Sequence, residues 1–422
     1  MTIVRNTSIT VFGRWLGVAA AAGAGLLVAD TMGAAGAGTF AMIRVIPAGV
    51  AAMLGAGVGP ANAYLVGGRK YPVQAITETT VALALVAGAL GWGLWLAGLG
   101  FIHARFYPML TTGVVALVGL GVLLNLLRDY LNSIQQGLQS FTEATIVLCL
   151  DDVGSLVLLL PLLGGVGGTG LIVASSLGGL VMSVLAALFF LMRAGLRPWP
   201  RIHRAIASEA LWFGLKSHVG RVANALNWRL DVMILAAFAS VEVVGCYAVA
   251  SKTAELFRPL GASLTYVLRP LLAGLDSDQA RRKGVVLYRW VFAINLATVA
   301  IMALVGGPLI MLLFGAEFAP AVPAFQILLI GLAAHGADPV LNGYYIGTGR
   351  PELITYTSLA GLVITVIGDV TLIPAYGLNG AAIASSVAYS VRAASLTAIF
   401  LWTTRVSVRA LLGIEELTPG PA

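Results

Sequence analysis

Residues 168–204 read GTGLIVASSLGGLVMSVLAALFFLMRAGLRPWPRIHR, an apolar run that gives way to a basic, proline-containing break. The run from 168 to 192 is long enough to cross a bilayer, because the hydrocarbon core takes about 20 apolar residues of helix. The break from Arg193 to Arg204 carries four arginines together with Pro198 and Pro200, and loops rich in Lys and Arg stay on the cytoplasmic side. This stretch predicts a membrane helix that ends at the cytoplasmic face.

The same alternation of apolar runs and short polar breaks extends along the whole chain. Of the 422 residues, 59% are hydrophobic and 10% are charged, whereas about a quarter of a soluble domain is charged. A water-soluble fold is therefore excluded. The predicted spans are 11–29, 39–61, 76–97, 108–127, 144–163, 168–192, 207–238, 241–273, 285–313, 322–346, 353–373 and 379–402. The sequence predicts an all-α polytopic membrane protein of about twelve transmembrane helices.

The cations between these spans are distributed very unevenly. With the N-terminus inside, fourteen fall on the cytoplasmic side: Arg5, Arg69, Lys70, Arg128, Arg193, Arg197, Arg201, Arg204, Arg281, Arg282, Lys283, Arg350, Arg405 and Arg409. The opposite loops hold only Arg105. This asymmetry predicts that both termini are cytoplasmic. The formal net charge of +7 is explained by this topology and by attraction to anionic lipids, rather than by nucleic-acid binding.

The break at Arg193–Arg204 falls between the sixth and seventh spans. It predicts two six-helix bundles, an N-terminal lobe of residues 1–196 and a C-terminal lobe of residues 197–422. A six-plus-six plan is common among secondary transporters, whose halves rock around a site near the middle of the membrane.

Seven cations fall inside the predicted spans, away from the ends from which they could reach water. They are Arg44, Lys216, Arg221, Arg229, Lys252, Arg258 and Arg392. A cation at the centre of a membrane helix costs about 2.5–3.5 kcal/mol on insertion scales, so such residues face a bundle interior or a watery cavity. Since guanidinium groups bind phosphate through paired hydrogen bonds, we expect these seven to line a cavity for an anionic substrate.

Three of the spans carry polar residues at steps of three and four, which place them on one helix face. These stripes are Arg221, Asn224, Trp228 and Asp231; Lys252, Glu255 and Arg258; and His335, Asp338, Asn342 and Tyr345. The middle stripe could be a self-contained ion pair. The last one, next to Pro339, could bind a cation or a sugar hydroxyl.

Carboxyl groups inside the spans are candidates for coupling to an H+ or Na+ gradient, because a carboxyl in hydrocarbon needs a partner or a proton. They are Asp151, Asp152, Asp231, Glu255, Asp338 and Asp369. The sequence lacks a GxxxxGK[ST] phosphate loop, an HExxH motif and a cluster of Cys and His ligands, so we expect no cofactor, no metal site and no catalytic residue. The chain is predicted to be a transporter and not an enzyme.

Several stretches resemble a known family. Residues 228–257, WRLDVMILAAFASVEVVGCYAVASKTAELF, and the later VLRPLLAGL carry RLD, VGxYAxAxK and xRPLLA elements in order. LFGAEFAPAVPAFQIL, GRPELITYTSLAG and LIPAYGLNGAAIASSVAYS follow, while GAAGAGTFAM and GVGPANAYLVGG match more loosely. They are similar to the Wzx-like flippase (polysaccharide transporter) branch of the multidrug/oligosaccharidyl-lipid/polysaccharide exporter superfamily. Asp369 departs from the pattern before LIP, where a neutral residue is expected.

This resemblance implies a MATE/flippase-like fold and the translocation of an undecaprenyl-pyrophosphate-linked oligosaccharide across the bacterial inner membrane, for capsule, O-antigen or exopolysaccharide assembly. It implies a cationic cavity between two lobes and, in some members, an ion gradient. Expected partners are the lipid-linked anionic glycan, membrane lipids, a polysaccharide polymerase and chain-length proteins.

Three alternatives compete with a flippase. An ion-coupled multidrug-type exporter would present acidic residues to cationic drugs, and the cationic excess argues against it. A non-transporting membrane subunit of a polysaccharide-synthesis complex would not need charges inside several helices. A membrane glycosyltransferase or polymerase would carry long loops with a metal-binding DxD, and the one such motif, Asp276, Ser277, Asp278, is more simply a solvated turn.

Overall fold

The computed structural model of the protein describes residues 2–68, 70–257, 277–348, 350 and 352–415, and the regular structure in them is entirely helical. Contacts between residues divide the chain into two compact units. Unit 1 comprises Met1–Ala225 and Ala239–Gly245, and unit 2 comprises Leu226–Phe238 and Cys246–Ala422. The boundary between these contact-based units differs from the boundary predicted at 196/197. The predicted boundary separates two groups of six membrane spans, and this division into two lobes stays a prediction.

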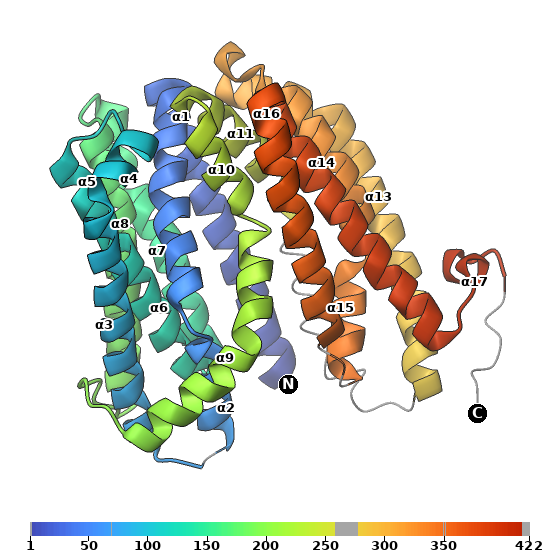
Figure 1. The fold of residues 1–422 in the computed structure, drawn as a ribbon, viewed down its shortest axis with the longest axis horizontal. Coiled ribbons are helices and arrows are strands. Elements are labelled where there is room, and N and C mark those ends of the chain that lie inside the picture. The colour runs from blue at the N-terminus through green and yellow to red at the C-terminus, as the bar shows by residue number, and fades with distance from the viewer. Residues whose placement is uncertain (1, 69, 258–276, 349, 351, 416–422) are drawn as a thin grey trace. The chain divides into compact units, whose positions relative to one another are not determined.

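Unit 1 is a bundle in which long helices pack side by side (Figure 1). Its helices are α1 (Thr2–Leu54), α2 (Val58–Gly68), α3 (Val73–Ala97), α4 (Leu99–Phe106), α5 (Thr112–Val118), α6 (Leu120–Gly137), α7 (Phe141–Leu159), α8 (Thr169–Arg193) and α9 (Arg204–Leu226), with a short 3-10 helix η1 (Leu160–Gly164). Helix α7 packs on α8 and α1, and α3 packs on α6. Helix α6 also contacts both α1 and α7, so the three helices meet around one polar region.

Unit 2 is also a bundle of packed helices. Its helices are α10 (Leu230–Phe238), α11 (Val241–Ala254), which begins in unit 1, α13 (Ser277–Phe314), α14 (Ala321–His335), α15 (Asp338–Gly347), α16 (Glu352–Thr404) and α17 (Val408–Leu412), with the 3-10 helices η2 (Glu255–Phe257) and η3 (Ala316–Phe318). Helix α16 packs on α14 and α10. The span predicted at 322–346 is broken at Gly336, where the Asn295 side chain donates to the carbonyls of Leu332 and Ala333, both at 3.1 Å.

Two of the helices are helical hairpins rather than single rods. Both α1 and α16 have 53 residues, which would make a straight helix about 80 Å long. Each contains one non-helical glycine at a kink, Gly33 (φ 64°) and Gly377 (φ 56°), and Figure 1 shows that the chain reverses within each of these helices. A Cβ on Gly380 would lie 2.2 Å from the carbonyl oxygen of Leu372, so the two arms of α16 pack directly against each other. Each hairpin accounts for two of the predicted spans.

Eight helical segments of the described residues are long and apolar enough to cross a membrane: Trp15–Leu54, Val73–Ala97, Thr112–Gly137, Phe141–Gly164, Thr169–Arg193, Asp278–Phe314, Ala321–Ile346 and Glu352–Thr404. The prediction of an all-α polytopic membrane protein is confirmed. The count of twelve spans and the cytoplasmic side of the termini stay predictions, and residues 258–273 of the eighth span lie outside the described residues.

One predicted span is displaced. The span predicted at 108–127 corresponds to α5 and α6, which together run to Gly137. Arg128 was assigned to a cytoplasmic loop, but it lies within α6 and its side chain is only 14% exposed. The assignment failed because the polar residues that follow Leu127 face the interior of the bundle instead of water: Tyr130, Asn132, Ser133 and Gln135 are all buried.

Candidate transport site

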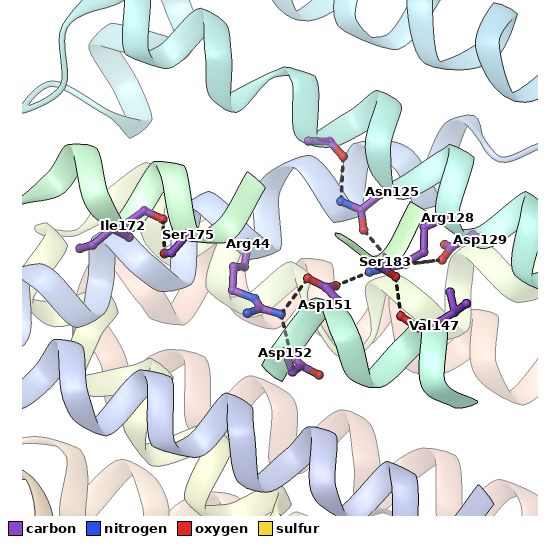
Figure 2. Close-up of polar contacts among 11 residues, drawn as sticks. Arg44, Asn125, Arg128, Asp129, Val147, Asp151, Asp152, Ile172, Ser175 and Ser183 are labelled. Atoms are coloured by element: carbon purple, nitrogen blue, oxygen red, sulfur yellow. Dashed lines mark hydrogen bonds and ion pairs between the residues drawn. The ribbon is translucent and has the colours of Figure 1, made fainter. Parts of the chain in front are cut away.

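Five charged side chains of unit 1 form one network, here called the Arg44–Arg128 cluster (Figure 2). It contains Arg44 of α1, Arg128 and Asp129 of α6, and Asp151 and Asp152 of α7. The Arg44 Nη2 atom lies 2.5 Å from Asp152 Oδ1 and 3.6 Å from Asp151 Oδ1. Asp151 accepts a hydrogen bond from Arg128 through its other oxygen, Oδ2. It therefore bridges the two arginines.

Arg128 is held by three neighbours. Besides Asp151, its Nη2 atom donates to Asn125 Oδ1 at 2.9 Å and to Asp129 Oδ1 at 2.9 Å. Asn125 lies three residues earlier on α6, so it faces the same side of the helix. It is itself fixed by donating to the carbonyl of Gly121 at 2.8 Å.

The cluster is not a purely cationic surface. Its three carboxylates exceed its two arginines, so with all five groups ionised its net charge is −1. Arg44 is less completely paired than Arg128, because its Nη1 atom is buried and has no hydrogen-bond partner within the described chain. The Arg44 side chain as a whole is 23% exposed.

Close helix packing fixes the position of Asp151 and Asp152. A Cβ on Gly179 of α8 would lie 2.3 Å from the Asp151 carbonyl oxygen, and one on Gly17 of α1 would lie 3.3 Å from Asp152 Oδ2. Ser183 of α8 also donates to the Val147 carbonyl at 2.5 Å (Figure 2). The small residues let α7 approach both neighbours, which brings its carboxylates up to Arg44.

Unit 2 contains a second polar region around Asp231 of α10. The Tyr247 hydroxyl donates to Asp231 Oδ2 at 2.5 Å, and the Ser385 hydroxyl donates to the same oxygen at 3.2 Å. The backbone N–H of Val232 donates to Oδ1 at 2.7 Å. Asp231 is 4% exposed, so this carboxylate is buried but well supplied with donors.

Asp369, on the first arm of α16, has the opposite environment. It is fully buried, and neither carboxylate oxygen has a hydrogen-bond partner among the residues that the structure describes. Asp231 is the charged neighbour that acts on it electrostatically. A cavity of about 10 Å³ adjoins Asp231 and is also lined by Ser251, Glu255 and Tyr389, which is room for about one water molecule.

A third group of polar residues lies at the break between α14 and α15. The Asp338 Oδ2 atom is 2.8 Å from His335 Nδ1 and 3.7 Å from Arg392 Nε. The His335 ring lies 5.4 Å from the Trp228 ring and 5.8 Å from the Tyr389 ring, centroid to centroid. Two members of the stripe predicted on helix ten, His335 and Asp338, thus stay paired across the break, and Arg392 of α16 lies next to Asp338.

The other predicted site residues are not drawn into these clusters. The Lys252 side chain is 74% exposed and lies 3.7 Å from Glu255, so the local ion pair is present, and the assignment of Lys252 to a cavity stays a prediction. Arg229 is half-buried in the turn that breaks the predicted seventh span between α9 and α10. The side chains of Lys216 and Arg221 and the whole of Arg258 lie outside the described residues.

The sequence did not single out several members of these clusters. Arg128 and Asp129 were placed beyond the end of the span predicted at 108–127, and Asn125, Tyr247 and Ser385, although inside predicted spans, were not named as site residues. The available signal was the continued amphipathic spacing of α6, whose apolar residues recur every three or four positions as far as Ile134. In the described parts of the chain, no group of three or more His, Cys, Asp or Glu side chains is placed to hold a metal ion.

Comparison with solved structures identifies the fold. The chain superposes on the lipid II flippase MurJ in an inward closed conformation with a TM-score of 0.76 and 15% identity, covering 97% of this chain and 90% of MurJ. It superposes on an inward-facing multidrug resistance MATE family transporter of the MOP superfamily with a TM-score of 0.72 and 17% identity, covering 92% and 93%. At this identity the likeness shows the fold alone.

Two other solved or curated proteins are also similar. A MOP superfamily transporter from Pyrococcus furiosus, for which reverse polarity of the binding pocket suggests a different function, gives a TM-score of 0.59 at 17% identity, covering 97% of this chain and 96% of that one. An uncharacterized membrane protein of Methanocaldococcus jannaschii is 26% identical over 193 residues, which are 44% of this chain and 38% of that protein's length.

The family itself follows from the sequence. The model of a family described as polysaccharide biosynthesis protein matches residues 35–323, well over half of the chain. That range includes all five residues of the Arg44–Arg128 cluster and Asp231. With the fold of MOP superfamily transporters, this chain is a member of the polysaccharide biosynthesis protein family.

Proposed function

We propose that the protein translocates a lipid-linked oligosaccharide of the undecaprenyl-pyrophosphate type across the bacterial inner membrane for surface polysaccharide synthesis. The observation that carries the proposal is Arg44, whose side chain lies within a membrane helix, is 23% exposed, and has a buried Nη1 atom without a hydrogen-bond partner in the described chain. Such a group binds a phosphate oxygen strongly, because the site is partly shielded from water. Membership of the polysaccharide biosynthesis family and the fold shared with a lipid II flippase support this substrate class.

In this proposal the two lobes alternate access around a central cavity, the head group crosses through it, and the lipid chains remain in the bilayer. The pyrophosphate is held by cations of the set predicted from the sequence, of which Arg44 and Arg392 are the interior members in the described chain. A polymerase and chain-length proteins would receive the product. An H+ or Na+ gradient drives the cycle through Asp369, since a fully buried carboxyl without a hydrogen bond needs a bound proton or cation, and through its neighbour Asp231.

A transport assay tests the proposal. Arg44→Ala is expected to reduce translocation of a fluorescent undecaprenyl-pyrophosphate disaccharide at least tenfold in proteoliposomes, measured by enzymatic access to the saccharide on the far leaflet. Arg282→Ala is the matched control, because Arg282 pairs with Asp278 at the start of α13 and is 51% exposed. Normal translocation by Arg44→Ala, or an equal loss in the control, would contradict the assignment.

An ion-coupled multidrug-type exporter is the second candidate. The carboxylate excess of the Arg44–Arg128 cluster favours it, since a net charge of −1 attracts a cation. The two candidates differ in one measurement. Translocation of a cationic dye by the same proteoliposomes, with no movement of the lipid-linked saccharide, would establish the exporter and exclude the flippase.

A further inference from the structure

The Arg44 guanidinium is already occupied by an anion that belongs to the chain. Its Nη2 atom lies 2.5 Å from Asp152 Oδ1, while the nearest oxygen of Asp151 is 3.6 Å away. Its Nη1 atom is buried without a partner in the described structure. Arg44 therefore uses one part of its donor fork on a carboxylate and keeps another part unsatisfied.

The three carboxylates of the cluster divide unequally between the two arginines. Asp151 and Asp129 both bond to Arg128, whose side chain is 14% exposed. Asp152 has Arg44 as its hydrogen-bond partner among the described side chains, and it is 27% exposed. Asp152 is thus the carboxylate that can leave with the least disruption, because Asp151 remains to hold α6 and α7 together through Arg128.

We propose that Asp152 is an internal competitor for the anion site at Arg44, so that a substrate phosphate binds there only by displacing the Asp152 carboxylate. This inference rests on the proposed function and adds a selectivity element to it. A carboxylate and a phosphate oxygen compete for the same N–H groups. A ligand with one weak charge binds Arg44 too weakly to offset the free energy lost when the Arg44–Asp152 pair breaks. A pyrophosphate, which has several charges and bidentate geometry, offsets this loss.

The competition has a second consequence for the empty protein. While Asp152 pairs with Arg44, the Arg44 charge is compensated, and leaving a buried charge without a partner is costly. The pair therefore keeps Arg44 in place between transport cycles. When the substrate binds, its phosphate replaces the Asp152 carboxylate at Arg44. The Asp152 carboxylate must then find another position.

The test measures binding of inorganic pyrophosphate to the purified full-length chain in detergent, by isothermal titration calorimetry in metal-free buffer. Asp152→Asn is expected to tighten binding about tenfold, because no internal ion pair has to be broken. Asp151→Asn is expected to have a smaller effect, in line with its longer distance of 3.6 Å from Arg44. Asp129→Asn is the matched control, since it removes the same charge from Arg128 instead and Asp129 is 58% exposed; its binding should stay within about twofold of the unaltered chain.

The outcomes separate this inference from the proposed function. Unchanged affinity in Asp152→Asn, or an equal gain in Asp129→Asn, overturns the competition, because only net charge would then matter. If Arg44→Gln loses binding while Asp152→Asn gains none, the transport site stands without a competitor. If Arg44→Gln binds pyrophosphate normally, or if neither the unaltered chain nor any variant binds it, both the competition at Arg44 and the proposed anion site there are wrong. Asp152→Ser repeats the comparison should the asparagine variant not fold.

Discussion

At the scale of single residues, Asp369 and Asp231 are neighbouring buried carboxyls that differ in their hydrogen bonding. Both are buried in unit 2, but Asp231 accepts from Tyr247, Ser385 and Val232 while both oxygens of Asp369 lack a partner in the described chain. A buried polar group without a hydrogen bond costs about 1–3 kcal/mol. Such a cost is retained at functional sites more readily than elsewhere.

We expect Asp369→Leu to stabilise the protein by about 1–3 kcal/mol, since it removes two unsatisfied oxygens, and to abolish gradient-driven translocation. Thermal unfolding in detergent and the proteoliposome assay measure the two effects. Asp231→Leu is the comparison: it strands the donors of Tyr247 and Ser385, so its melting temperature should fall. A lower melting temperature for Asp369→Leu would show that the carboxyl is satisfied in the protein.

The sequence could not predict which charged residues pair with each other across helices, and the reason is physical. Asp151, Asp152 and Asp369 were singled out because they lie inside apolar spans, and helical spacing reports only which residues share a face of one helix. It does not report which helix that face meets. Arg44 and Asp152 are 108 positions apart, so the neutralisation of a predicted cavity cation by a predicted coupling carboxylate appears only in three dimensions.

At the scale of helices, α7 and α8 depend on one glycine at their closest approach. A Cβ on Gly179 would lie 2.3 Å from the Asp151 carbonyl oxygen, a backbone atom that cannot rotate away. We expect Gly179→Ala to destabilise the protein by about 1–3 kcal/mol and to weaken pyrophosphate binding, because α7 must shift. Melting temperature and calorimetry provide the readouts.

Gly170→Ala, on the same helix α8, is the control, since a Cβ there meets nothing within 4 Å. Its stability should be unchanged or slightly increased, because alanine favours the helix over glycine. Equal effects of the two substitutions would mean that helix propensity, and not close packing, decides the outcome at Gly179.

Helix boundaries were predictable where a span ends in water and not where it ends inside the bundle. The spans predicted at 76–97, 144–163 and 168–192 agree closely with α3, α7 with η1, and α8, because their flanks are turns, Pro or Arg. Helix α6 was cut short at residue 127, since hydropathy cannot distinguish polar residues that face a neighbouring helix from those in a loop.

At the scale of the whole molecule, cysteine labelling tests directly on which side of the membrane each loop lies. Reassigning Arg128 to the interior leaves thirteen loop cations on the predicted cytoplasmic side and Arg105 on the other. In a cysteine-free background, we expect Arg197→Cys to react with a membrane-impermeant maleimide only after the cells are opened, and Arg105→Cys to react in intact cells. The reverse pattern would invert the topology and the direction of transport.

The reversals at Gly33 and Gly377 join paired membrane segments through a single non-helical residue each. Such tips contain almost no chain for a protease, an antibody or an epitope tag to engage. They also leave no room for a signal that would orient the second arm independently. We therefore expect each hairpin to enter the bilayer as one unit during biosynthesis, with its orientation set by the charged residues at its open end.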